Sequence, residues 1–291
     1  MEYKTLNNGI KMPILGFGVF QIDDLEECEK VVSIAIQQGY RLFDTARSYK
    51  NEVAVGKAIK KSGIPREEFF ITSKVFINEM NYEQTKQAVF DSLKNLDIDY
   101  IDLYLIHMPL NDYYGAYRAL VELYKEKKIR AIGVSNFLND RLYDLYLNFD
   151  IKPAINQIEC HPHYQREEEI ELNKKLNIEI EGWAPFAEGL KGMFQEAVLV
   201  ELANKYHKSV PQIILRWNIQ RGVIVIPKST HEERIKENID VFDFTLDEQD
   251  MKKIASLNKN KPSMLDTRDI QEIDRLYNYL KNPILTSLKE Q

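Results

Sequence analysis

Four polar residues of complementary chemistry follow short apolar runs in the first half of the chain: Asp44, Tyr49, Lys74 and His107. A tyrosine hydroxyl is a weak acid at neutral pH, because its ordinary pKa is about 10. A lysine ammonium at ~4 Å stabilises the phenolate by about 4 kcal/mol, so we expect Lys74 to bring the pKa of Tyr49 into the neutral range. Asp44 would keep Lys74 protonated, and a neutral His107 could orient a substrate oxygen toward Tyr49. Such a group suits protonation of a carbonyl oxygen during reduction, without a metal ion.

Each of these residues also has an ordinary structural interpretation. Tyr49 is one of 16 tyrosines, and a single tyrosine is usually a packing residue with a satisfied hydroxyl. Asp44 and Lys74 could form a structural ion pair. We favour the catalytic interpretation because polar groups end several successive apolar runs, and packing does not explain that pattern.

The apolar runs alternate with amphipathic helical patterns through almost the whole chain. Strands are predicted at 14–18, 41–45, 69–75, 100–107, 129–136, 154–159, 178–184 and 222–227. Nearly continuous apolar strands separated by helices are typical of a parallel sheet covered on both faces. Eight such units predict an α/β fold, a closed (β/α)8 TIM barrel, with a doubly wound open sheet as the alternative. Because no linker divides the chain, residues 1–291 are expected to form a single domain.

Both ends of the chain are expected to lie outside this repeat. Asn8-Gly9 is a strong turn signal, which predicts an N-terminal β-hairpin. No strand pattern follows residue 258, and this C-terminal tail is expected to be helix and loop lying over the barrel. Catalytic groups of such barrels collect at the carboxyl ends of the strands. Polar or aromatic residues predicted at those ends are Asp44, Lys74, His107, Ser135, Asn136, Gln157, Glu159 and Trp183.

A local cationic segment, residues 226–238, enters a predicted helix near the end of the repeat. Lys228 and Ser229 stand before that helix, whose N-terminal amides favour anions. Arg234 adds a planar set of donors suited to phosphate. In a chain of net charge −6, an anionic cofactor requires a local site of this kind. The segment favours NADPH over NADH.

Six motifs in this order resemble the aldo-keto reductases. They are GFGVF (16–20), DTARSYKNE (44–52), ITSKV (71–75), LIHMP (105–109), GVSNF (133–137) and IPKSTHEERIKEN (226–238). The resemblance covers about residues 4–258, and it is greatest to bacterial members related to diketogluconate and glyoxal/methylglyoxal reductases. It implies a (β/α)8 barrel, NADPH/NADP+ as cofactor, and reduction of aldehydes or ketones to alcohols. It also implies that Asp44, Tyr49, Lys74 and His107 form a catalytic tetrad.

The resemblance further implies where cofactor and substrate bind. Ser135, Asn136 and Gln157 would hold the nicotinamide carboxamide, Trp183 would stack on its ring, and segment 184–190 would follow the pyrophosphate. Lys228, Ser229 and Arg234 would bind the 2′-phosphate, with Glu237 and Asn238 near adenine. The full expected cofactor set is Gly18, Val19, Ser135, Asn136, Gln157, Trp183, Ala184, Pro185, Lys228, Ser229, Thr230, Arg234, Glu237 and Asn238, with His107 and Phe20 at the substrate. Two positions depart from common family residues: Ala184 replaces a serine, and Met108 replaces a tryptophan.

Two other motifs could indicate different chemistry. His161-Pro162-His163 has the spacing of some barrel metallohydrolases. No third ligand completes a set at matching strand ends, so no metal site is predicted. Residues 16–21 begin like a dinucleotide fingerprint, but Gln21 replaces the third glycine. In a barrel, Gly18 would instead let the backbone approach a ligand.

The composition is that of an ordinary globular chain. It has 291 residues, of which 44% are hydrophobic and 29% charged, and only two cysteines, which fits a reducing cytosol. The N-terminus resembles no secretory signal, and no apolar run reaches the roughly 18 to 20 residues that cross a bilayer. The acidic balance does not favour nucleic acid. We expect a cytoplasmic oxidoreductase, a monomer acting on a small dicarbonyl, keto-sugar or aromatic aldehyde.

An NADPH-binding regulatory subunit with little turnover is the alternative function. The complete tetrad favours the enzyme, because a sensor has no need of all four residues together. A metallohydrolase is a third possibility, and it would lose activity to chelators. The loops over the barrel mouth choose the substrate, so the sequence leaves its identity open.

Overall fold

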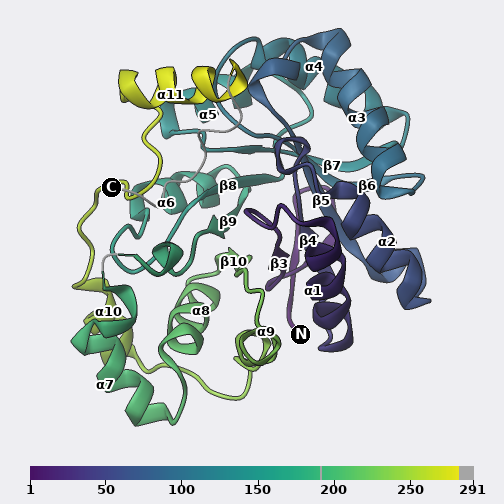
Figure 1. The fold of residues 1–291 in the computed structure, drawn as a ribbon. Helices are drawn as coiled ribbons and strands as arrows, with labels where there is room; N and C mark the ends of the chain where they lie inside the picture. Colours follow the sequence, from purple (N-terminus) through teal and green to yellow (C-terminus); the bar gives the residue numbers. More distant parts are fainter. Residues whose placement is uncertain (191, 282–291) are drawn as a thin grey trace.

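Each of the eight predicted apolar runs contains a strand, and these strands pair in the order of the sequence. The computed structural model describes residues 1–190 and 192–281. Its main sheet is wholly parallel, and its strands lie side by side in sequence order from β3 to β10 (Figure 1). The strands are β3 (Phe17–Gly18), β4 (Leu42–Asp44), β5 (Phe70–Val75), β6 (Ile101–Ile106), β7 (Ile129–Ser135), β8 (Ile155–Glu159), β9 (Glu179–Trp183) and β10 (Ile224–Val225).

The two ends of this sheet meet, so the sheet is a barrel. Leu15, just before β3, forms a parallel bridge with Val225 of β10. The N–H of Gly16 donates to the carbonyl oxygen of Val225 at 2.8 Å, and the N–H of Val225 donates to the carbonyl oxygen of Ile14 at 3.0 Å. The predicted (β/α)8 barrel is confirmed. The open doubly wound sheet is wrong, because it would leave these two strands as unpaired edges.

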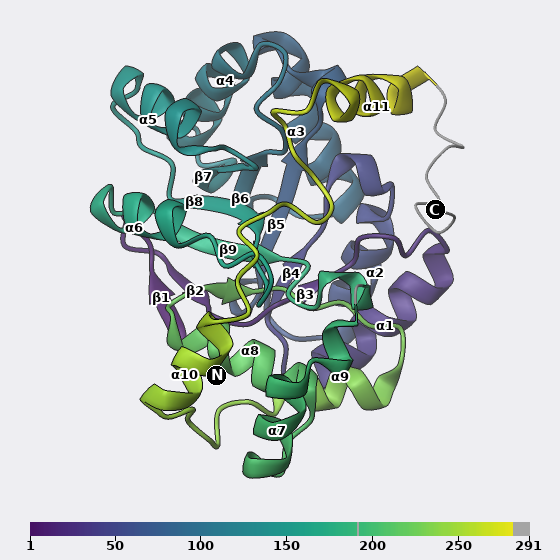
Figure 2. The same cartoon turned by 90° about the vertical axis from the view of Figure 1, so that its left-hand side faces the viewer.

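Helices surround the barrel on the outside (Figures 1 and 2). The first, α1, shows why the chain folds this way locally: Asp24 caps its N-terminus by accepting from the N–H of Glu27, and Val31, Val32 and Ala35 lie on its buried face. The helices are α1 (Leu25–Gln37), α2 (Glu52–Ser62), α3 (Tyr82–Leu96), α4 (Tyr113–Lys125), α5 (Asn139–Asn148), α6 (Glu167–Lys175), α7 (Ala197–Tyr206), α8 (Val210–Gln220), α9 (Glu232–Ile239), α10 (Glu248–Ala255) and α11 (Ile270–Lys281). Short 3-10 helices are η1 (Arg47–Tyr49), η2 (Arg66–Glu68), η3 (Ile77–Glu79), η4 (Ala187–Gly189) and η5 (Met193–Gln195).

The predicted N-terminal hairpin is confirmed and lies at the amino end of the barrel. Strands β1 (Tyr3–Thr5) and β2 (Lys11–Pro13) pair antiparallel. The turn between them contains Gly9 at φ 86°, a conformation that glycine adopts without strain. The side-chain amides of Asn7 and Asn8 donate to the carbonyl oxygens of Pro153 and Arg130, which lie at the starts of β8 and β7. The hairpin is therefore tied to the strands that it covers.

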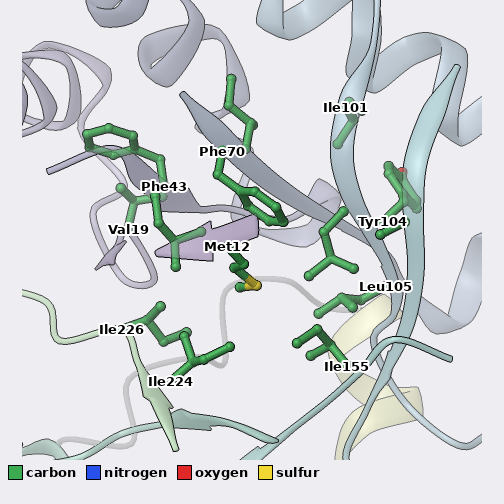
Figure 3. Packing of buried hydrophobic residues seen from close by; sticks show 14 of the residues in the cluster. Met12, Val19, Phe43, Phe70, Ile101, Tyr104, Leu105, Ile155, Ile224 and Ile226 are labelled. Atoms are coloured by element: carbon green, nitrogen blue, oxygen red, sulfur yellow. The ribbon is translucent and has the colours of Figure 1, made fainter. Parts of the chain in front are cut away.

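The interior of the barrel is filled by apolar side chains from the strands and the hairpin. Figure 3 shows Met12 of β2 surrounded by Phe70, Leu105, Ile155 and Ile224, each from a different barrel strand. All five side chains are buried. Packing of this kind makes the barrel a solid core rather than a pore, and it leaves only the carboxyl end of the strands for chemistry.

The C-terminal tail crosses that carboxyl end, as expected. The N–H of Ser263 donates to Oε1 of Glu159, the last residue of β8, at 2.9 Å, and the N–H of Lys259 donates to the carbonyl oxygen of His163 at 2.8 Å. Beyond this crossing, α11 packs Leu276 into the core. Figure 2 shows the tail passing over the strands toward α11. Within the described residues, no helix is long and apolar enough to cross a membrane.

Candidate active site

The four predicted catalytic side chains meet at the carboxyl ends of β4, β5 and β6. Nζ of Lys74 donates to Oδ1 of Asp44 at 2.6 Å and contacts the hydroxyl of Tyr49 at 3.3 Å. The imidazole of His107 lies edge-on to the ring of Tyr49, with 5.7 Å between ring centroids. One buried ammonium therefore contacts both a carboxylate and a phenol, next to an imidazole.

Local structure holds Tyr49 in this position. Tyr49 ends η1, immediately after β4, and Lys50 closes the turn in a left-handed conformation. Asn51 ties the turn to its surroundings: its Oδ1 accepts from Oγ1 of Thr45 at 2.8 Å, and its Nδ2 donates to the carbonyl oxygen of Val19 at 2.9 Å. Asn51 is buried, so these hydrogen bonds are protected from water.

The Asp44–Lys74 pair is buried, with both side chains at most 3% exposed. Burial by itself lowers the pKa of Lys74, but the neighbouring charges of Asp44 and Tyr49 and the hydrogen bond to Asp44 outweigh it, so that the pKa lies above its usual value. Lys74 also donates to the carbonyl oxygen of Thr45 at 3.0 Å. The ammonium therefore stays charged without contact with solvent.

The expectation of a neutral-range pKa for Tyr49 is wrong for this structure. Burial raises the pKa of Tyr49 above its usual value, and the opposing charge of Lys74 only partly offsets that rise. The expectation counted the attraction of one ammonium and left out the cost of placing a phenolate away from water. Tyr49 consequently holds its proton throughout the neutral range, as a proton donor must.

The imidazole of His107 is neutral at pH 7. Burial, followed by repulsion from the Lys74 charge, holds the pKa of His107 well below 6.5. Its Nδ1 is buried and has no hydrogen-bond partner among the described residues, while Phe76 packs against the ring at 5.4 Å between centroids. A neutral imidazole can donate one hydrogen bond to a substrate oxygen without competing for the Tyr49 proton.

Four residues predicted to hold the nicotinamide also lie together, on β7, β8 and β9. Oγ of Ser135 donates to the carbonyl oxygen of Gln157 at 2.9 Å, and Nδ2 of Asn136 donates to the carbonyl oxygen of His107 at 3.0 Å. Nε1 of Trp183 donates to Oδ1 of Asn136 at 2.9 Å. Asn136 has a φ of 63°, which asparagine tolerates better than most residues. This turn brings the group next to the tetrad.

The three predicted ligand-binding residues at the end of β3, Gly18, Val19 and Phe20, differ from one another in environment. Phe20 is 49% exposed and packs on Tyr49 with 4.9 Å between ring centroids, as a pocket wall would. Val19 is buried, and its backbone is engaged, since its N–H donates to the carbonyl oxygen of Asp44. A Cβ at Gly18 would lie 3.1 Å from the carbonyl oxygen of Ile226, so barrel closure already restricts this position. Cofactor contacts at Gly18 and Val19 stay predictions.

The segment predicted to follow the pyrophosphate leaves β9 through a strained turn. Ala184 has a φ of 47°, a conformation that costs a non-glycine residue about 1 kcal/mol or more. Its carbonyl oxygen accepts from the N–H of Ala187 at 2.9 Å, and Pro185 between them is buried. The side chain of Gln21 reaches Glu188 from the opposite side, after β3. The two segments therefore adjoin at the barrel mouth.

The cationic segment lies where the carboxyl end of β10 leads into α9. Lys228 and Arg234 are exposed, and neither forms a salt bridge to a described residue. Oγ of Ser229 accepts from the N–H of His231 at 3.1 Å, immediately before α9 begins at Glu232. Two exposed cations beside a helix N-terminus fit the phosphate of an anionic cofactor, and the charge of Lys228 also acts on Glu188.

The adenine-side residues are partly committed to other contacts. The carboxylate of Glu237 accepts from Oγ of Ser209, the cap of α8. Asn238 is buried, and Thr230 is half-buried. Contacts of these three residues with the cofactor therefore stay predictions.

The His161-Pro162-His163 motif forms no metal site within residues 1–190 and 192–281. Nε2 of His161 lies 2.9 Å from Oε1 of Glu159, and Nε2 of His163 lies 2.7 Å from Oε1 of Glu196. The two imidazoles are thus paired with two different carboxylates. They hold the loop after β8 against the tail and the segment before α7.

Sequence reasoning missed one buried acid at the site, Glu181 of β9. Its Oε2 accepts from Nε2 of Gln157 at 2.7 Å, and the side chain has no exposed surface. The run 178–184 alternates isoleucine and glutamate, a pattern that by itself does not tell an interior acid from a surface one. Only the register of β8 and β9, in which Gln157 stands opposite Glu181, identifies it.

Comparisons with known proteins agree with this geometry. The model of the aldo/keto reductase family matches residues 14–259. The chain is 49% identical over 257 residues to a glyoxal reductase of Bacillus subtilis, covering 88% of this chain and 92% of the relative. It is 44% identical over 259 residues to the methylglyoxal reductase DkgA of Escherichia coli O157:H7, covering 88% and 93%.

A solved structure adds the cofactor. The Bombyx mori aldo-keto reductase crystallised in complex with NADP superposes on 94% of this chain and 96% of its own, with a TM-score of 0.88 and 36% identity. The family match and this structure confirm the expected reaction class, carbonyl reduction with NADPH/NADP+. With its barrel, its buried Asp44–Lys74–Tyr49 contacts and its exposed cations beside α9, the chain belongs to the aldo/keto reductase family and is an NADP-dependent oxidoreductase.

Proposed function

We propose that this enzyme reduces small aldehydes and ketones, dicarbonyls among them, with Tyr49 as the proton donor. The observation that carries the proposal is the position of Lys74, whose ammonium contacts the Tyr49 hydroxyl and the Asp44 carboxylate together. The two relatives compared above are named for glyoxal and methylglyoxal. A dicarbonyl of that size is the substrate class to test first.

Each member of the tetrad has one role in the proposal. Bound NADPH supplies the hydride. His107 is neutral and donates a hydrogen bond to the carbonyl oxygen, which places that oxygen beside Tyr49. Tyr49 keeps its proton until charge develops on the oxygen, and then transfers it. Lys74 stabilises the phenolate that forms, and Asp44 keeps Lys74 protonated.

The cofactor preference follows from the cationic segment. Lys228 and Arg234 are exposed, and they offer two charges to the 2′-phosphate that distinguishes NADPH from NADH. Ser229 and the first amides of α9 complete the site. We therefore propose a preference for NADPH, with weak use of NADH.

The remaining properties are proposed from the sequence. A cytoplasmic location fits two buried, unpaired cysteines, Cys28 and Cys160. A monomeric state is proposed because the sequence offers no obvious additional apolar surface for a second subunit. The regulatory alternative requires little turnover, and the assembled contacts of Lys74 argue against it, because cofactor binding alone does not need them.

A panel of carbonyls assayed with NADPH and with NADH tests this function. Glyoxal, methylglyoxal, an aromatic aldehyde and a keto-sugar would each be followed by loss of absorbance of the reduced nicotinamide. We expect turnover with the small dicarbonyls and a lower KM for NADPH than for NADH. Tight NADPH binding without turnover of any carbonyl would favour the regulatory subunit instead.

A further inference from the structure

Glu181 is an acid inside the barrel that forms no salt bridge to a described residue. It is fully buried, its Oε2 has one hydrogen-bond donor, the side-chain amide of Gln157 at 2.7 Å, and its Oε1 has no partner among the described residues. An acid in such a place costs stability unless it is paired or neutral. The tetrad roles above do not use it.

The amide of Gln157 links this acid to the tetrad. Its Nε2 donates to Oε2 of Glu181 at 2.7 Å and to Oδ2 of Asp44 at 2.8 Å. An amide nitrogen carries two hydrogens, so both donors of Gln157 are used. With the amide turned over, its oxygen would face Oδ2 of the Asp44 carboxylate, which has no hydrogen to donate, and this is unfavourable. Asp44 therefore sets the orientation of the amide, and Glu181 accepts its second hydrogen. Oε1 of Gln157 is then the atom left for a ligand.

A fixed acceptor at this point selects between the two sides of a carboxamide. The NH2 group of a nicotinamide carboxamide can donate to Oε1 of Gln157, whereas its carbonyl oxygen would be repelled. The side of the carboxamide that faces Gln157 determines which face of the nicotinamide ring is turned toward Tyr49 and His107. The two carboxyl groups that accept from Nε2 of Gln157 thus bear on which hydrogen of the cofactor reaches the substrate.

We propose that Glu181 is a positioning residue that, together with Asp44, locks the side-chain amide of Gln157 and so fixes the orientation of the nicotinamide. The inference rests on the proposed function, because it assumes that the carboxamide binds at Gln157. Glu181 lies on β9 and would act on the cofactor through Gln157 of β8. Glu181 touches neither the substrate nor the reacting atoms.

The role requires an acceptor oxygen at position 181 and no negative charge. Burial and the nearby Asp44 raise the pKa of Glu181 to about 8, so the carboxyl is mostly protonated at pH 7 and its second oxygen still accepts from Gln157. Glu181→Gln keeps that acceptor and resembles the neutral carboxyl. Glu181→Leu removes the acceptor and leaves Asp44 alone to hold the amide. Comparing Glu181→Gln with Glu181→Leu shows whether the hydrogen-bond acceptor or the charge at position 181 is needed.

The experiment measures NADPH binding and the isotopic fidelity of hydride transfer in the full-length enzyme. Binding is followed by quenching of tryptophan fluorescence. Fidelity is the fraction of deuterium in the product when the cofactor carries deuterium on one defined face of C4. For Glu181→Gln we expect a Kd within about twofold of the wild type and unchanged fidelity. For Glu181→Leu we expect a Kd raised by about tenfold, the effect of one lost hydrogen bond, and label transferred from both faces.

Controls separate this role from a general loss of structure. Glu179→Gln changes an acid of the same strand that pairs with Lys4 at 3.2 Å, away from the tetrad, and it should match the wild type in both measurements. If Glu181→Leu does not fold, Glu181→Met tests the same loss with a more flexible side chain. Fidelity is the decisive readout, because a purely structural defect lowers activity without mixing the two faces.

Two results would overturn the proposal. If Glu181→Leu binds NADPH as tightly as the wild type and keeps full fidelity, Gln157 does not need Glu181. If Glu181→Gln is impaired as much as Glu181→Leu, the charge matters rather than the acceptor. Either result leaves wild-type turnover intact and is thus distinguishable from failure of the proposed function, in which the wild type itself reduces no carbonyl.

Discussion

Two regions of this enzyme place cations where negative charge must be stabilised. The tetrad buries its cation, whereas the cationic segment exposes its two. At the tetrad, Lys74 is fully buried and already paired with Asp44. At the cationic segment, Lys228 and Arg234 are exposed and form no salt bridge to a described residue. The buried ammonium needs no rearrangement when charge develops on a reacting oxygen. The exposed pair remains hydrated until a phosphate arrives, so it contributes affinity rather than rate.

The largest difference should appear when each lysine is replaced by methionine. Lys74→Met leaves the buried Asp44 carboxylate without its cation, which should lower the free energy of unfolding by about 3 to 5 kcal/mol and abolish turnover. Lys228→Met should change the free energy of unfolding by less than about 0.5 kcal/mol and only weaken NADPH binding. Urea denaturation and steady-state kinetics of the two variants measure this. Equal destabilisation would show that the two regions do not differ as described.

A smaller effect is expected from Arg234→Gln, which acts on cofactor choice alone. Removing a charged donor from a phosphate should raise the KM for NADPH by about 10- to 100-fold. The KM for NADH should stay the same, because NADH has no 2′-phosphate, and the melting temperature should not change. Kinetics with both cofactors provide the test. A parallel rise in both KM values would place Arg234 elsewhere on the cofactor.

The buried region should also respond to pH in a way that the exposed segment does not. The pKa of Glu181 is raised to about 8 in the folded protein, against about 4.3 for an unfolded chain. Between these values the folded state binds a proton that the unfolded state has released, so stability falls as pH rises through this window. Glu181→Gln removes this loss, and its melting temperature should exceed that of the wild type at pH 8 and approach it near pH 5. A difference independent of pH would refute the raised pKa.

The smallest effect should come from salt. At 0.15 M ionic strength the screening length is about 8 Å, and it falls to about 3 Å at 1 M. The Kd for NADPH should therefore rise several-fold between these conditions, because the cations at the segment are exposed. The turnover number at saturating NADPH should stay within about twofold, because Lys74 is shielded from ions. A fall in turnover number with salt, at constant Kd, would reverse the assignment of the two regions.

The strands and the tetrad were predictable from the sequence for a physical reason. Buried parallel strands are nearly continuous apolar runs, and a polar residue ending such a run, as Lys74 and His107 do, stands out against them. The contacts of Glu181 were not predictable. Glu179 and Glu181 lie two residues apart and so point to the same side of β9, yet one pairs with Lys4 and the other with Gln157.

The pKa of Tyr49 shows a second limit of sequence reasoning. A sequence motif predicts which charged residue lies near the phenol, and Lys74 does contact the Tyr49 hydroxyl. The motif does not predict how far the fold buries the phenol, and burial has a larger effect on the pKa of Tyr49 than the charge of Lys74 has. Lys74 therefore makes Tyr49 a stronger acid than an equally buried tyrosine without a cation would be, although its pKa stays above the usual value. The resting enzyme holds the proton tightly.

Replacing Tyr49 with phenylalanine tests the central claim most directly. Tyr49→Phe keeps the ring contacts with Phe20 and His107 and removes only the hydroxyl that Lys74 contacts. We expect a turnover number lower by about 10²- to 10⁴-fold with methylglyoxal, the usual contribution of a proton donor, and a Kd for NADPH within about twofold of the wild type. Full turnover in Tyr49→Phe would show that Tyr49 is not the proton donor.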